Sequence, residues 1–486
     1  MTDQLPSFGH PLSDRGFKVL QPIGRVGWVG HGRHLILGQR TGRGSLSNLI
    51  FLGKCIEHTG APDYFDSNVW LDVSFPHAIF LSGARGSGKS FDIGVFVESL
   101  LLNPSSKVTT SNHPAAVLLL DPQNQFWTLG RPPDENLPED EEHTAALKAW
   151  SLQPAAIGDV RVYVCPGDPT PIGTEVDFTL PASLLTADDL CSFWGTDVYS
   201  PQGHLISTVL EKVSQTGYDS APAGASPDAL PEHVSALSEF TLEDLVKCLQ
   251  TDTEILRSTP TQTVDAVNWR LNSLRKLGIF VAKGIPFVDL LVNGRATVVS
   301  LRSVDDATKA LVGGLLVKKV YELMGAHHSK RKVERRLHGA TQAISGGLPE
   351  HVWCVVDEAH LFCPADHDTS STRALIEYVK RGRDAGLSLL LATQQPSAVN
   401  SRLLSQVDTV LVHRLTFGGD IHAALDRIPA AIPESFMTGN TPKDARGLVR
   451  LLESGEAILG DAQADRAFLF RTRPRLTAHG GSEPKP

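Results

Sequence analysis

The sequence predicts an α/β fold built on a mostly parallel sheet, and three observations lead to this prediction. Continuous apolar runs recur along the chain, as in HAIFLSG, AAVLLLD and LSLLLAT, and such runs without alternation are typical of strands buried on both faces. Amphipathic stretches separate most of these runs, so strands and helices alternate. A glycine-rich turn, GARGSGKS, lies between one such strand and a helix. We therefore expect a doubly wound sheet with helices on both faces.

Composition is that of an ordinary globular protein. The 486 residues are 41% hydrophobic and 20% charged, so a sizeable core needs no disulfide or metal. No apolar run is long enough to cross a membrane, the N-terminus lacks a secretory pattern, and six scattered cysteines form no CxxC pair; we expect a cytoplasmic protein without a membrane partner. The net charge of −9 disfavours a generic nucleic-acid coat but allows positive charge confined to a narrow channel.

The pattern changes along the chain and suggests how it is divided. Short apolar runs alternate with glycine-rich turns between Phe17 and Val73, which favours a small N-terminal β-barrel. The buried strands follow, interrupted by a stretch with helical patterns that we interpret as an inserted helical subdomain, and the chain ends in a tail expected to be disordered. The expected divisions are the β-rich domain 1–75, the two parts of the core 76–182 and 286–475, the helical insertion 183–285 and the tail 476–486.

The phosphate-binding pattern GxxxxGK[ST] is matched in full by GARGSGKS, between an apolar strand and a helix. Its glycines let the backbone wrap around phosphates, and the N–H groups at the helix start supply positive potential. Lys89 would reach the β- and γ-phosphates and Ser90 would hold Mg²⁺, so ATP and Mg²⁺ are the expected cofactors. The expected nucleotide-binding residues are Gly83, Ala84, Arg85, Gly86, Ser87, Gly88, Lys89 and Ser90.

A second acidic site follows the apolar strand VWCVV, which ends in Asp357 and Glu358. Asp357 would bind the metal through its water shell, and Glu358 would polarise the attacking water. Two adjacent carboxylates indicate hydrolysis rather than binding alone, because one of them is free of the metal. The alternative interpretation is an ordinary solvated strand end with two carboxylates. The presence of the phosphate loop in the same chain disfavours this alternative.

Polar residues near the strand LSLLLAT are candidates for sensing the γ-phosphate. Gln394 follows this strand and would act as the sensor, unless TQQPS is only a turn. Arg383 precedes the strand and is our candidate arginine finger, which would act in trans on a neighbouring subunit. Arg381 and Arg414 remain alternatives for the finger, and the cations before the strand could merely complement a helix C-terminus.

The basic run from His327 to Arg336 is the best stretch for contacting nucleic-acid phosphates. We expect it to be an inserted surface loop, and simple solvation of that loop is the competing interpretation.

Several motifs together resemble the HerA-FtsK superfamily, and within it the HerA-like ATPases. In order they are GARGSGKS, VLLLDPQNQF, RATVVSLRSVDDATKALVGGLLVKKV, VVDEAH, GRDAGLSLLLATQQPSAVNSRLLSQVDTVLVHRLT and GEAILGD. The match covers roughly residues 75–130 and 285–475. The resemblance implies a RecA-like P-loop NTPase core, a homohexameric ring, and translocation or unwinding of double-stranded DNA in its central channel. It also implies a partner nuclease or antiphage effector.

Under this resemblance Lys89 and Ser90 match the phosphate-loop pair, Asp357 and Glu358 match the metal and catalytic pair, Gln394 matches the sensor and Arg383 the trans-acting position. The chain departs from the family twice. Gln125 stands where relatives often carry an acidic residue, and His77 stands where they can carry Arg. Two other functions stay open: a nucleotide-dependent scaffold ring that licenses a partner effector, and a conjugation- or secretion-type ATPase.

Overall fold

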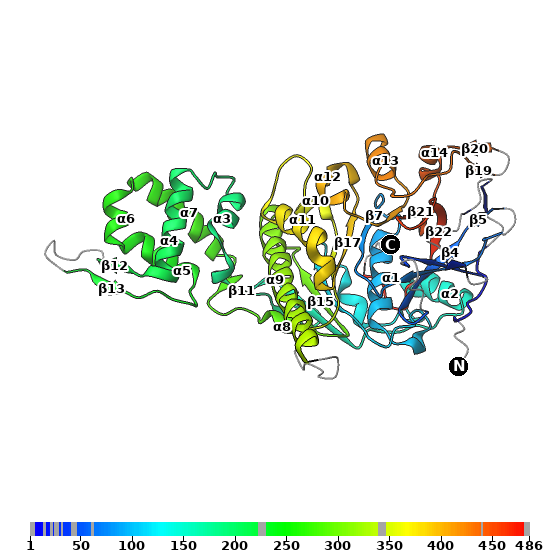
Figure 1. Cartoon of the computed structure of the whole chain (residues 1–486), viewed down its shortest axis with the longest axis horizontal. Helices are drawn as coiled ribbons and strands as arrows, with labels where there is room; N and C mark the ends of the chain where they lie inside the picture. The colour runs from blue at the N-terminus through cyan, green and yellow to red at the C-terminus, as the bar shows by residue number, and fades with distance from the viewer. Residues whose placement is uncertain are drawn as a thin grey trace.

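A 14-stranded sheet forms the centre of the molecule (Figure 1) in the order β10-β9-β15-β8-β16-β17-β7-β18-β21-β22-β4-β6-β3-β2. The structure, a computed structural model, describes residues 5–12, 16–19, 23, 29–30, 33–39, 46–59, 63–221, 230–338, 347–438 and 441–480. Every pairing between neighbours from β10 to β18 in this order is parallel, and the pairing of β18 with β21 is antiparallel. The predicted α/β fold with a mostly parallel sheet is therefore confirmed.

The parallel strands are buried on both faces, as their apolar runs predict. In β8, Val117 and Leu119 share a core cluster with Phe96 of α1 (Lys89–Leu101). Leu118 and Leu120 share another cluster with residues of α9 (Asp306–His338) and α11 (Ser370–Gly382). Alternate side chains of one strand thus meet different helical layers. The strands are β10 (Val176–Asp177), β9 (Asp159–Val164), β15 (Arg295–Ser300), β8 (Ala116–Asp121), β16 (Val352–Val356), β17 (Leu387–Thr393), β7 (Ala78–Ser82) and β18 (Thr409–Val412).

The N-terminal strands extend the central sheet, so the expected separate barrel over 1–75 is not confirmed. Antiparallel pairing of β22 with β4 joins them to the core, and the buried Glu57 fixes this junction by accepting from Arg466 Nη2 at 2.8 Å and from the backbone N of Leu469 at 2.7 Å. These strands are β21 (Glu456–Asp461), β22 (Phe468–Thr472), β4 (Leu49–Cys55), β6 (Asn68–Asp72), β3 (His34–Leu37) and β2 (Val29–Gly30). A second sheet contains β20 (Thr441–Lys443), β19 (Phe436–Thr438), β1 (Phe17–Lys18) and β5 (Glu57–His58).

A helical lobe projects from one end of the molecule (Figure 1) and falls within 183–285, where a helical insertion is expected. Its neck is the parallel pairing of β11 (Leu180–Pro181) with β14 (Phe280–Val281). The expected linker 220–233 lies largely outside the described residues. The lobe contains α3 (Ala187–Phe193), α4 (Pro201–Glu211), α5 (Leu242–Thr251), α6 (Thr253–Ser258), α7 (Thr261–Arg275) and the hairpin of β12 (Tyr218–Ser220) and β13 (Glu232–Val234).

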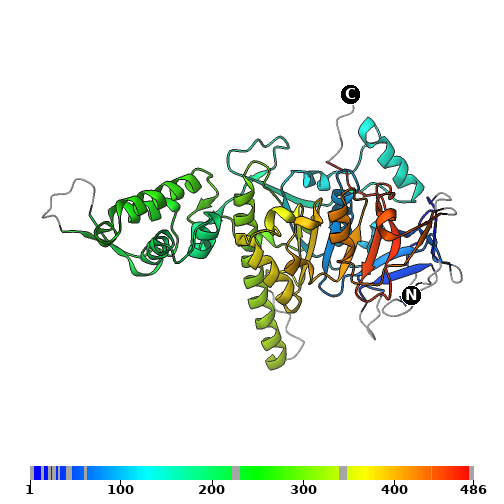
Figure 2. The ribbon, with the colours of Figure 1, turned by 90° about the horizontal axis from the view of Figure 1, so that it is seen from above.

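The basic run His327–Arg336 belongs to the long helix α9 (Asp306–His338), so the expectation of a loop is wrong. The run contains neither Gly nor Pro and is rich in Lys, Arg and Glu, which favour helix. The C-terminal turns of α9 extend beyond the sheet (Figure 2). None of the helices in the described ranges has the length and apolarity needed to cross a bilayer.

The remaining helices cover the two faces and the edges of the sheet. They are α1 (Lys89–Leu101), α2 (Glu141–Ala149), α8 (Phe287–Leu290), α10 (Ala359–Phe362), α11 (Ser370–Gly382), α12 (Ser401–Leu404), α13 (Gly418–Leu425) and α14 (Ala445–Val449).

The C-terminal segment 473–480 packs against α1 through buried charges. Arg473 Nη1 donates to Glu98 Oε1 at 2.5 Å, and both side chains are fully buried. Glu98 also accepts from the backbone N of Leu476 at 2.8 Å, which supplies the further hydrogen bonds that a buried ion pair requires. A Cβ at Gly94 would lie 2.3 Å from Arg475 Nε, so glycine is needed there. The tail expected to be disordered from residue 476 is thus packed to residue 480, and 481–486 lie outside the described residues.

Candidate functional site

The phosphate loop connects the end of β7 to the start of α1. Gly86 has φ 71° and Gly88 has φ 117°, both in the left-handed region that favours glycine. The loop is held from two sides, because Ala84 N donates to the backbone oxygen of Arg414 at 2.8 Å and Gly455 N donates to that of Ser87 at 3.1 Å. The predicted turn therefore has the backbone freedom and the support that close wrapping around a phosphate requires.

Lys89 turns back into the loop. Its Nζ donates to the backbone oxygen of Ala84 at 3.2 Å, and the residue is only 5% exposed. Burial lowers the pKa of Lys89, while the negative charges of Glu358, Asp357 and Asp92 oppose this shift. The ammonium group thus lies among carboxylates, in the position from which it can bind a phosphate chain.

Asp357 and Glu358 follow β16, beside the phosphate loop. Asp357 is 1% exposed, its Oδ1 accepts from Glu358 N at 3.0 Å, and its Oδ2 has no hydrogen-bond partner among the described residues. Burial, with the nearby charges of Glu358 and Asp121, raises the pKa of Asp357 to about 8. One oxygen of this carboxylate therefore meets no hydrogen-bond donor among the described residues, and the nearby charge of Lys89 does not offset the effect of burial on its pKa.

These features fit a Mg²⁺ ion that binds together with a nucleotide. The unpartnered oxygen of Asp357 and the hydroxyl of Ser90 are hard oxygen ligands, which Mg²⁺ prefers. No cluster of three or more His, Cys, Asp or Glu ligands occurs in the described part of the chain. Phosphate oxygens of a bound nucleotide and water would complete the coordination of this ion, as is usual for Mg²⁺ in phosphoryl-transfer sites.

Glu358 is held in an unusual conformation by amide groups. Its backbone lies in the left-handed region with φ 50° and ψ 53°, which non-glycine residues adopt only when their surroundings hold them there. Its carboxylate accepts from the backbone N of Gln394 at 3.3 Å, from Gln394 Nε2, and from Gln123 Nε2 at 3.0 Å. The structure thus brings the predicted sensor and the predicted catalytic carboxylate into direct contact.

Gln123 is a site residue that our sequence reasoning missed. It follows β8, which pairs with β16 in parallel, and the carboxyl ends of neighbouring parallel strands meet at the same edge of a sheet. The stretch DPQNQF contributes to the family resemblance and lacks an acidic residue at Gln125, but neither observation predicts a role for Gln123. Its position after a buried strand was the signal that could have placed Gln123 beside Glu358.

Arg383 lies at the opposite edge of the sheet from this site. It precedes β17, whose seven residues span roughly 20 Å before Gln394 is reached. Its side chain is 63% exposed and Nη2 lies 3.9 Å from Asp408 Oδ2, near the buried His77. The structure therefore does not bring Arg383 to the phosphate loop of its own subunit.

The two alternatives to Arg383 have local roles. Arg381 is exposed at the end of α11, where its Nε lies 3.1 Å from Glu377 Oε2. Arg414 follows β18 and supplies its backbone oxygen to the phosphate loop.

A cleft of about 740 Å³ opens above the phosphate loop, within the size range of small-molecule sites. The C-terminal segment and the end of α2 form the wall that faces the loop. The lining residues include Arg85, Gly86, Gly88, Lys89, Ser90, Phe91, Gln123, Gln125, Trp150, Gln394, Arg471, Pro474 and His479.

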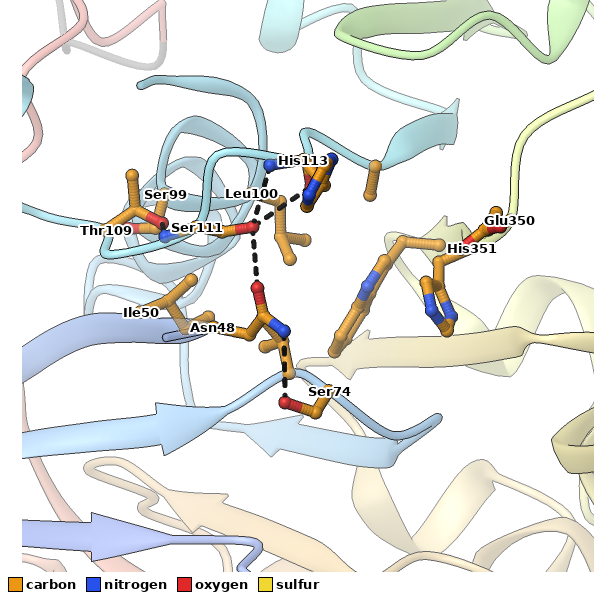
Figure 3. Close-up of a pocket in the computed structure, with 13 residues that line it drawn as sticks. Asn48, Ile50, Ser74, Ser99, Leu100, Thr109, Ser111, His113, Glu350 and His351 are labelled. Carbon is orange, nitrogen blue, oxygen red and sulfur yellow. Dashed lines mark hydrogen bonds between the residues drawn. The ribbon is translucent and has the colours of Figure 1, made fainter. Parts of the chain in front are cut away.

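A smaller pocket of about 120 Å³ lies where β8 and β16 begin (Figure 3). The Asn48 amide bridges Ser111 Oγ at 3.1 Å and Ser74 Oγ at 3.3 Å, and His113 and His351 lie nearby. Since this pocket lies at the opposite edge of the sheet from Lys89 and Glu358, it is not part of the phosphate-binding site.

The fold and the loop together define the P-loop class of nucleotide-binding proteins. The family model described as "Helicase HerA, central domain" matches residues 50–320, and the chain belongs to this family. The resemblance predicted from the motifs is thereby confirmed.

The chain is also similar to helicases of DNA double-strand break repair and to a solved structure that shares its fold. The DNA double-strand break repair helicase HerA of Pyrococcus furiosus is 25% identical over 175 residues, which are 33% of this chain and 32% of the relative. The protein of the same name from Sulfurisphaera tokodaii is 24% identical over 173 residues, 35% of this chain and 30% of the relative. The match thus spans about a third of their length. The solved structure of VirB4 of Thermoanaerobacter pseudethanolicus covers 90% of this chain and 98% of its own at a TM-score of 0.51 and 13% identity, which shows a shared fold.

Proposed function

We propose that the protein hydrolyses ATP and uses this reaction to move double-stranded DNA, as a homohexameric ring acting in the cytoplasm. The observation that carries the proposal is that Lys89, which lines the cleft above the phosphate loop, lies close to the carboxylates of Asp357 and Glu358 in a chain of the HerA family. The related helicases of DNA double-strand break repair support DNA as the polymer on which the motor acts.

Each site residue has a defined task in this reaction. The loop N–H groups and Lys89 bind the β- and γ-phosphates. Glu358 orients the attacking water and accepts its proton, while Gln394 connects this carboxylate to the γ-phosphate. Ser90 and Asp357 hold Mg²⁺, which neutralises phosphate charge when bound with the nucleotide.

Arg383 completes the site of the next subunit around the ring in this proposal. Its exposure and its distance from its own phosphate loop support a role in trans. We expect Arg383→Ala to lower hydrolysis by on the order of 1000-fold, as loss of an arginine finger does. Mixing Arg383→Ala with Glu358→Gln subunits should restore measurable hydrolysis, because some interfaces then pair an intact Arg383 with an intact Glu358.

The matched control for this mixing experiment is Arg381→Ala, which removes an exposed arginine from the same helix end. It should keep most of the activity. If the mixture of the two inactive variants stays inactive although it forms mixed oligomers, a role of Arg383 in trans is refuted.

The end of α9 is the proposed DNA contact. Lys330, Lys332, Arg335 and Arg336 are exposed there on a helix that extends beyond the sheet (Figure 2). We expect linear duplex DNA to raise ATP hydrolysis severalfold. The double variant Lys332→Glu with Arg336→Glu should need about tenfold more DNA for half-maximal stimulation, because reversed charges repel phosphates.

The double variant Lys247→Glu with Arg257→Glu makes the same charge change on exposed residues of the helical lobe, and it should leave the DNA response unchanged. A wild-type enzyme that hydrolyses ATP and ignores DNA would instead favour the scaffold ring, in which nucleotide binding licenses a partner effector. In either case a nuclease or antiphage effector would dock on the lobe, and the 73% exposure of Trp269 on α7 is the observation that favours this position.

A further inference from the structure

The carboxylate of Glu358 is surrounded by donors that do not belong to the substrate. Oε1 accepts from Gln123 Nε2 at 3.0 Å and from Gln394 Nε2, and Oε2 accepts from Gln394 N at 3.3 Å. His360 Nδ1 lies 3.5 Å from Oε2 and bonds with Thr393 Oγ1 at 3.0 Å. Glu358 is only 4% exposed. Both oxygens are therefore engaged before any water enters the site.

A second amide fixes the orientation of Gln123. Gln125 Nε2 donates to Gln123 Oε1 at 2.7 Å, so the Gln123 amide presents its N–H group to Glu358. The backbone of this turn is held by Asp121, which accepts from Gln123 N at 3.2 Å and Gln125 N at 2.7 Å. Gln125, Gln123 and Glu358 thus form a directed chain of hydrogen bonds on a rigid turn.

This chain has a chemical consequence for hydrolysis. Hydrogen bonds to the ionised form of a carboxylate stabilise that form and make the group a weaker base. Two amide N–H groups donate to Oε1 and one donates to Oε2, so Glu358 becomes a stronger base for the attacking water when the Gln123 N–H group no longer donates to Oε1. Gln123, Gln125 and Gln394 all line the cleft, so a ligand that fills it can compete for the same amide groups.

We propose that Gln123, oriented by Gln125, is a positioning residue that restrains Glu358 in a resting state and releases it when the motor engages DNA. This inference rests on the proposed function and adds a regulatory element to the same site. The left-handed backbone of Glu358 agrees with a residue held in place by its neighbours. The restraint keeps ATP hydrolysis slow until the polymer is bound.

The test is steady-state ATP hydrolysis with and without linear duplex DNA by the full chain. Gln123→Met keeps the side-chain length and removes the donor. We expect basal kcat to rise about two- to tenfold, the effect of one hydrogen bond, with KM unchanged and DNA stimulation falling toward onefold. A merely structural role would not raise kcat while abolishing the response to DNA.

Gln125→Glu tests the same chain of hydrogen bonds at Gln125, the residue that orients Gln123. A carboxylate at 125 can only accept, so the Gln123 amide turns its N–H group toward it and its oxygen toward Glu358. We expect the same rise in basal kcat. Gln395→Met, which changes an exposed amide in the same turn as Gln394, is the matched control and should behave as wild type.

Thermal melting shows whether each variant is folded. If Gln123→Met does not fold, Gln125→Glu alone tests the restraint on Glu358. A fall in kcat, or an unchanged kcat and DNA response in folded variants of an active enzyme, overturns the restraint and leaves the proposed function intact. Absence of hydrolysis by the wild type with and without DNA overturns both.

Discussion

Lys89→Ala should lower ATP hydrolysis by on the order of 100- to 1000-fold and weaken nucleotide binding as well. The side chain lies within the phosphate loop, with Nζ 3.2 Å from the backbone oxygen of Ala84. Its removal takes away the charge that binds the phosphates and leaves Asp357, Glu358 and Asp92 without their nearest cation. Phosphate release and binding of a fluorescent ATP analogue measure the two effects.

Lys89→Arg tests whether the positive charge of the side chain is sufficient or whether its shape also matters for hydrolysis. The guanidinium group keeps the charge but is planar and larger than an ammonium group, so we expect it to remain defective in hydrolysis. Thermal melting identifies variants that have simply lost their fold. A folded Lys89→Ala protein that keeps a tenth or more of the wild-type rate would contradict the role of the phosphate loop in hydrolysis.

Glu358→Gln should lower hydrolysis by about 100- to 10,000-fold, the range for loss of a general base. Unlike Lys89→Ala, it should retain nucleotide binding, because Glu358 contacts Gln123 and Gln394 rather than the phosphate loop. Single-turnover experiments with radiolabelled ATP should find the nucleotide bound and uncleaved. This pair of outcomes distinguishes a residue of the chemical step from a residue of binding.

Glu350→Gln is the matched control, since this carboxylate lies at the other edge of the sheet and pairs with Arg331. It should hydrolyse ATP at the wild-type rate. Near-normal hydrolysis by Glu358→Gln would move the role of general base to another group and would remove the basis of the restraint by Gln123.

The phosphate loop and the acidic pair could be predicted from the sequence because their signals are local. Gly86 and Gly88 supply the left-handed backbone that the turn needs, and an apolar run leads directly into Asp357 and Glu358. The parallel sheet was predictable for a related reason. A strand covered on both faces must be apolar at every position, and that pattern is visible without knowledge of its neighbours.

The N-terminal strands and the end of α9 show where local signals fail. Short apolar runs in 1–75 predict strands, but strand pairing depends on the distant β22 and on the buried Glu57–Arg466 contact. The basic run 327–336 looks like a loop by charge, whereas the residues before it continue the same helix. Strand pairing is therefore set by contacts far along the chain, whereas the helix at 327–336 had a local signal in its helix-favouring residues.

The sequence by itself determined the P-loop class and the α/β sheet, and it predicted Lys89, Asp357, Glu358 and Gln394 as candidate site residues. Only the tertiary structure decided that Gln123 bonds to Glu358, that Arg383 lies at the opposite edge of the sheet from its own phosphate loop, and that the C-terminal segment forms a wall of the cleft. The reason is physical. A motif encodes its own backbone geometry, whereas a contact between two strand ends exists only after the sheet has brought them to one edge.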